Sequence, residues 1–134
     1  MTLYHMATRC LSLAAALGTL ALLVSAARPW GDNDAYQGWL GYAGLFLLAV
    51  WAILPYLGIL LLARRAVAVK AGEILVLAGA LIMTGGGLAA YVDAVWLHPD
   101  PQGGLAFVVV PLYQGIVLGV LTGLLLLIKK RRVP

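Results

Sequence analysis

The apolar positions of this chain fall into four long runs separated by short polar segments. The runs cover residues 10–27, 39–63, 74–97 and 105–128, and Asp93 is the one charged residue inside them. A transmembrane helix needs about 20 predominantly apolar residues to cross roughly 30 Å of hydrocarbon. None of the runs alternates in polarity as a membrane β-strand does. The pattern predicts an all-α membrane protein with four transmembrane helices, arranged as two antiparallel hairpins in one domain covering residues 1–134.

Composition excludes a soluble domain. Apolar residues make up 63% of the chain and charged residues 10%, whereas soluble domains carry about 25% charged residues. The net charge of +4 does not indicate a nucleic-acid partner, because the basic residues cluster at the ends of the runs and leave no basic face. We therefore expect the lipid bilayer to be the main partner of the chain.

The basic residues predict the orientation in the membrane. Eight of the nine lie in segments that the four runs place on one side, and Arg28 alone lies on the other. The eight are Arg9, Arg64, Arg65, Lys70, Lys129, Lys130, Arg131 and Arg132. The other side holds acidic and aromatic residues, among them Asp32, Asp34, Asp100, Trp30 and Tyr36. By the positive-inside rule both termini are expected to be cytoplasmic, and the brevity and composition of the chain indicate a bacterial inner membrane.

The first run also has the outline of a secretory signal peptide. Arg9 precedes an apolar stretch that ends in the small residues Ser25, Ala26 and Ala27, as cleaved signals do. Cleavage would leave three spans. We expect the run to be retained, because eight residues precede Arg9 and a three-span product would lack the paired hairpins.

The two halves of the chain resemble each other enough to suggest a tandem repeat. A shift of 65 residues superposes Gln37-Gly38 on Gln102-Gly103 and the basic pair after the second run on that after the fourth. Chance similarity between apolar helices is the alternative, since Gln-Gly is also good turn chemistry. Pro55 and Pro111 lie near opposite ends of their runs, which argues against close duplication.

Glycines predict where helices approach closely. Gly115, Gly119 and Gly123 recur every four residues and form a glycine zipper, which Pro111 extends by one turn. Small residues on one face allow the close approach that drives helix association in lipid, so we expect a packing seam within the chain, with homo-oligomerisation as the alternative. In the third run, Gly86, Ala89, Ala90 and Asp93 share a face and predict a second groove of small residues.

Gln114 is the strongest polar candidate inside the spans. A buried amide in lipid needs hydrogen-bond partners, and Thr84 at similar depth or the carbonyl of Phe107, which Pro111 deprives of its donor, could supply them. We expect a structural hydrogen bond, and coordination of a substrate or ion by Gln114 with the help of Asp93 is the alternative. Tyr113 is a further polar candidate beside it. Glu73 lies at the positive start of a helix, where its charge is favourable.

Catalytic chemistry is not indicated. His98 with Asp93 and Asp100 is the best metal set that can be assembled, and Cys10 is the single cysteine, so a metal, haem or other cofactor is not expected. We predict a non-catalytic accessory subunit, assembly factor or interaction partner of a larger membrane complex. A small oligomeric transporter or channel is the alternative, and an enzyme acting on lipid comes third.

Overall fold

Four long helices make up most of the molecule. The computed structural model describes residues 2–28, 38–66, 69–99 and 103–130. Its helices are α1 (Leu3–Ala27), α2 (Trp39–Ala66), α3 (Lys70–Val92) and α4 (Ala106–Lys130). A π-helical turn, η2 (Asp93–Leu97), continues α3, and a 3-10 turn, η3 (Gly103–Leu105), precedes α4. These ranges contain no β-strand, which confirms the predicted all-α class, and four of their helices are long and apolar enough to cross a membrane.

The helices extend beyond the apolar runs. Helix α1 begins at Leu3, seven residues before the predicted span, because the Thr2 side chain caps it by accepting a hydrogen bond from the His5 backbone N–H at 3.3 Å. Helix α3 begins at Lys70, four residues before its predicted start. Charged or polar residues end an apolar run but do not end a helix, so span limits and helix limits differ.

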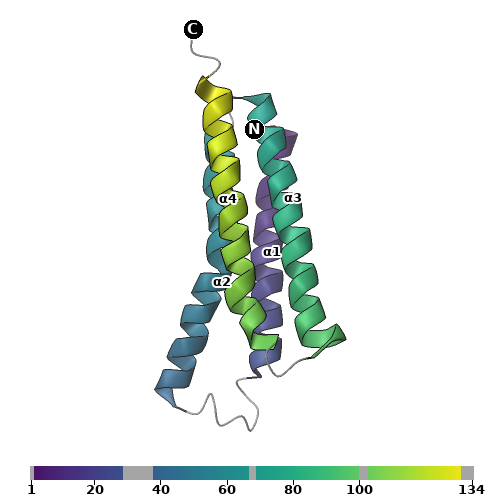
Figure 1. Cartoon of the computed structure of the whole chain (residues 1–134), viewed down its shortest axis with the longest axis vertical. Coiled ribbons are helices and arrows are strands. Elements are labelled where there is room, and N and C mark those ends of the chain that lie inside the picture. The colour runs from purple at the N-terminus through teal and green to yellow at the C-terminus, as the bar shows by residue number, and fades with distance from the viewer. Residues whose placement is uncertain (1, 29–37, 67–68, 100–102, 131–134) are drawn as a thin grey trace.

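The four helices form a bundle (Figure 1), and their contacts place α1 and α4 diagonally opposite each other. Helix α1 packs against α2 and α3, α4 packs against the same two helices, and α2 and α3 also contact each other. Helix α1 begins and α4 ends at the same end of the bundle, at the top of Figure 1.

Helix α2 bends away from the bundle in its first half (Figure 1). Pro55 lies inside this helix, and a proline there removes one backbone donor and clashes with the preceding turn. No residue from 39 to 51 is buried, and Ala52 is the first that is. Trp51 still ties the bent helix to α4, because its indole N–H donates to the Val108 carbonyl at 3.1 Å.

Leucines of α4 fill hollows that glycines leave on the neighbouring helices. A Cβ built on Gly58, Gly72 or Gly79 would collide with a side chain of α4. The side chains concerned are Leu118, Leu125 and Leu121 respectively. In lipid, such close contacts provide much of the attraction between helices, so this face of α4 holds it in the bundle.

A first apolar cluster lies toward the end of the bundle where α2 and α4 end, and it includes Ile59, Val76 and Leu121. A second apolar cluster lies at the other end of the bundle. Leu23 of α1, Tyr91 of α3 and Phe107 of α4 are buried there together. The rings of Tyr91 and Phe107 stack with centroids 4.5 Å apart and planes 10° from parallel. The two clusters leave the middle of the bundle to polar side chains.

Candidate functional site

A buried hydrogen-bonded group joins all four helices in the middle of the bundle. The Thr19 hydroxyl of α1 donates to the Tyr56 hydroxyl of α2 at 3.2 Å. The amide nitrogen of Gln114, on α4, donates to the same hydroxyl at 3.2 Å and to the Met83 carbonyl of α3 at 3.0 Å. Thr19, Tyr56 and Gln114 are each at most 4% exposed. The predicted structural hydrogen bond of Gln114 is therefore present, but its partners are neither Thr84 nor the Phe107 carbonyl.

Gly87 makes room for this group. A Cβ built on Gly87 would collide with the Gln114 amide nitrogen and would stand 3.3 Å from the Tyr56 hydroxyl oxygen. Its neighbours Gly85 and Gly86 have open space where a Cβ would be. Of the three consecutive glycines, only Gly87 is therefore required by the packing of the chain.

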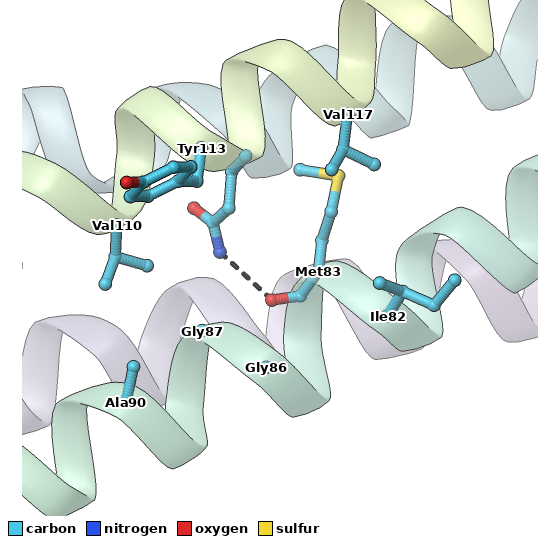
Figure 2. A pocket seen from close by; sticks show the side chains of 9 residues that line it. Ile82, Met83, Gly86, Gly87, Ala90, Val110, Tyr113 and Val117 are labelled. Atoms are coloured by element: carbon cyan, nitrogen blue, oxygen red, sulfur yellow. Dashed lines mark hydrogen bonds between the residues drawn. The ribbon is translucent and has the colours of Figure 1, made fainter.

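A pocket lies between α3 and α4 beside Gln114, and we refer to it as the Gln114 pocket (Figure 2). Its volume is about 220 Å³. The dashed line that ends on the Met83 carbonyl in Figure 2 is the hydrogen bond from the Gln114 amide, and both residues line the pocket. The remaining lining is almost wholly apolar and comes from both helices: Ile82, Met83, Gly86, Gly87, Ala90, Val110, Tyr113 and Val117.

The predicted groove of small residues coincides with this pocket only in part. Gly86 and Ala90 line it, whereas Ala89 is exposed and Asp93 does not contribute to the lining. Tyr113 belongs to the lining although 64% of the residue is exposed. Thr84 is buried, and its hydroxyl oxygen has no hydrogen-bond partner in the part of the chain that the structure describes.

Asp93 lies at an exposed end of the bundle, paired with His98. The ring Nδ1 of His98 is 2.8 Å from the Asp93 carboxylate oxygen, and the His98 backbone N–H donates to the Asp93 carbonyl at 2.8 Å. Both interactions span five residues, which is the spacing that the π-helical turn η2 provides. Asp100, the third member of the metal set considered above, lies outside the described residues. Among those described, no three His, Cys, Asp or Glu side chains come together as a metal site would need.

The predicted glycine seam within the chain is wrong. Gly115, Gly119 and Gly123 are exposed, and a Cβ built on any of them would meet nothing within 4 Å. Gly86, the packing residue expected on α3, is open in the same way. The physical reason is the rotation of α4, which turns Gln114 and the leucines toward α2 and α3 and the three glycines outward.

Sequence reasoning missed a polar stripe on α1. Its buried residues include His5, Thr8, Ser12 and Thr19, which recur at the three- and four-residue spacing of one helix face. That spacing is visible in the sequence, but placing the start of the span at residue 10 left out its first half. The Thr8 hydroxyl donates to the Tyr4 carbonyl at 2.9 Å, whereas His5 Nδ1 and the Ser12 hydroxyl have no partner among the described residues.

Glu73 is more deeply placed than its position in the first turn of α3 suggests. The residue is 4% exposed, and one of its carboxylate oxygens has no hydrogen-bond partner within the described ranges. A negative charge at a helix N-terminus is favourable, but that position does not account for the burial.

Comparison of the sequence and structure with protein-family models, curated proteins and solved structures finds no match.

Proposed function

We propose that the protein is a non-catalytic membrane subunit that binds a transmembrane helix of a larger membrane complex. The observation that carries the proposal is the outward-facing stripe of Gly115, Gly119 and Gly123, against which no described residue packs within 4 Å of an added Cβ. Association of helices in lipid depends on close approach along small residues. The glycines that serve the fold itself lie elsewhere, on α2 and α3, so the stripe is free to receive another helix.

The basic residues support an orientation for this subunit. With eight of nine on one side, the positive-inside rule favours cytoplasmic termini, and we infer a bacterial inner membrane. Several residues behind this inference, including Arg131, Arg132 and Asp34, lie outside the described part of the chain, as do Gln37 and Gln102 of the suggested repeat.

Affinity purification of the tagged chain from native membranes tests the binding of a partner. We expect wild type to retain a larger membrane protein in stoichiometric amount, and Gly119→Leu to lose it because an isobutyl group blocks close approach. Val120→Leu is the control: it replaces the valine one residue along, at an exposed position about 100° around the helix, with the same leucine side chain, and should retain the partner. Retention of the partner by Gly119→Leu would contradict the proposal. Purification of a homo-oligomer without a larger partner would show that the chain associates with itself instead.

A small transporter or channel is a second candidate, and the polar interior favours it. Ser12, Thr84 and Gln114 each hold a buried polar atom without a partner among the described residues, and polar groups inside membrane bundles often mark solute pathways. Flux of small solutes into vesicles reconstituted with the protein is the test. A flux that disappears in Gln114→Leu, and is weakened in Asp93→Asn, would promote this candidate above the first.

A further inference from the structure

The Gln114 pocket presents one hydrogen-bond acceptor that the fold does not use. The Met83 carbonyl can only accept a hydrogen bond, so the amide nitrogen of Gln114 must face it, and this fixes which end of the amide is which. The nitrogen uses its two N–H groups on Met83 and Tyr56. The amide oxygen is left buried, with no hydrogen-bond partner among the described residues, on a residue that is 4% exposed.

The rest of the pocket selects against charge. None of the lining residues that the structure describes carries an ionised group at neutral pH, and aliphatic side chains such as Ile82, Val110 and Val117 form much of the wall. An ion placed there would lose its hydration without gaining a counter-charge. A ligand must therefore be neutral and mostly apolar, with a donor for the Gln114 oxygen.

The depth of Gln114 in the membrane and the volume of the pocket narrow the class of ligand further. Gln114 is four residues from the midpoint of α4, which is about 6 Å along the helix axis, whereas headgroups begin about 15 Å from the bilayer centre. A phospholipid headgroup therefore lies too far away to reach it. The volume of about 220 Å³ exceeds that of a cavity of about 150 Å³ known to take up benzene, so a substituted ring fits.

We propose that the Gln114 pocket binds a neutral, lipid-soluble molecule with a compact apolar body and one hydroxyl group, which donates to the Gln114 amide oxygen. A phenol is the simplest member of this class. Gly86 lines the pocket, is exposed and has open space where a Cβ would be, so the ligand enters beside it from the bilayer. The site is distinct from the glycine stripe proposed for a partner helix, because Tyr113 and Gly115 flank Gln114 on opposite sides of α4 at about 100° each.

A matched pair of ligands tests whether a hydroxyl group of the ligand donates a hydrogen bond in the pocket. Fluorine NMR titration of the full chain in detergent micelles compares para-trifluoromethylphenol with its methyl ether, which has nearly the same body and no donor, and protein-free micelles correct for partitioning. We expect the phenol to bind wild type about fivefold more tightly, as one neutral hydrogen bond provides. Equal affinity of the two ligands for wild type would overturn the proposal.

Matched variants of the protein test whether the ligands bind in the Gln114 pocket. Gly86→Leu fills the pocket and should lose both ligands, whereas Gly85→Leu adds the same side chain at the preceding open position, outside the lining, and should bind as wild type. Gln114→Leu should abolish the preference for the phenol. Neither glycine has a neighbour within 4 Å of an added Cβ, so both leucine variants should fold, as thermal unfolding can verify. Wild-type phenol binding by Gly86→Leu would place the ligand elsewhere and refute the assignment.

Discussion

At position 87 the absence of a side chain decides how closely α3 and α4 approach each other. The Gln114 amide occupies the space that a methyl group would take, and from there it reaches both Met83 and Tyr56. Tyr56 in turn holds Thr19 of α1. One glycine thus allows a single hydroxyl to join α1, α2 and α4.

Gly87→Ala should destabilise the protein, although alanine favours a helix more than glycine does. Moving the amide aside is a form of overpacking, which costs about 1–3 kcal/mol. Gly85→Ala adds the same methyl group two residues away in open space and should be neutral or slightly stabilising. Thermal unfolding in detergent compares the two variants, and equal midpoints would show that Gln114 does not depend on Gly87.

The shared hydroxyl of Tyr56 predicts that Gln114→Leu and Tyr56→Phe are not additive. Interhelical hydrogen bonds in a membrane protein average about 0.6 kcal/mol and reach about 1.7, so Gln114→Leu should be mild. Because each single variant breaks the bond between the two side chains, the double variant should cost less than the sum, by about 0.6 kcal/mol. Trp51→Phe, which removes a bond to the Val108 carbonyl, should combine additively with Gln114→Leu in the same unfolding measurements.

Among the elements, α4 presents three different surfaces. Gln114, Leu118, Leu121 and Leu125 face α2 and α3 and fill the hollows left by their glycines. The side of the helix that carries Tyr113 borders the pocket, and the glycine stripe faces outward. The same residue type therefore has opposite consequences for stability, depending on the face it occupies.

Leucine at Gly79 and leucine at Gly119 should differ in their effect on stability. Gly79 lies against Leu121, so Gly79→Leu should lower the unfolding temperature by several degrees, as overpacking of about 1–3 kcal/mol does in a chain of this size. Gly119→Leu should unfold like wild type and like Gly119→Ala, because a Cβ added there meets no described residue within 4 Å. A loss of stability in Gly119→Leu as large as in Gly79→Leu would mean that the stripe faces inward.

For the whole molecule, the basic residues make the orientation in the membrane a testable expectation. A reporter that is active only outside the cytoplasm should give signal when fused near Asp34 or Asp100. Fusions at Ala68 or Pro134 should give none, since both follow clusters of basic residues. Reporter signal from either of these two fusions would show that the orientation is the reverse of the expected one or that the number of spans is not four.

The sequence was sufficient to predict the four helices, because each is a long apolar run. It also predicted that Gln114 would be hydrogen-bonded, since an amide in lipid needs partners. The identity of the partners and the direction of the glycine stripe could not be predicted. Both depend on the rotation of each helix about its axis, and in α4, which is apolar on most faces, hydrophobic periodicity does not fix that rotation.

The hydrogen bonds of Tyr56 have a consequence for the order of assembly during synthesis. Helices leave the ribosome in chain order, so Thr19 enters the bilayer before its partner Tyr56 exists. Gln114 is in the opposite position: Tyr56 and Met83, and the glycines that receive the leucines of α4, have all been made before it emerges. The first three helices therefore form the surface against which the fourth packs. A chain truncated after α3 should then bind α4 expressed as a separate fragment and form the four-helix bundle with it.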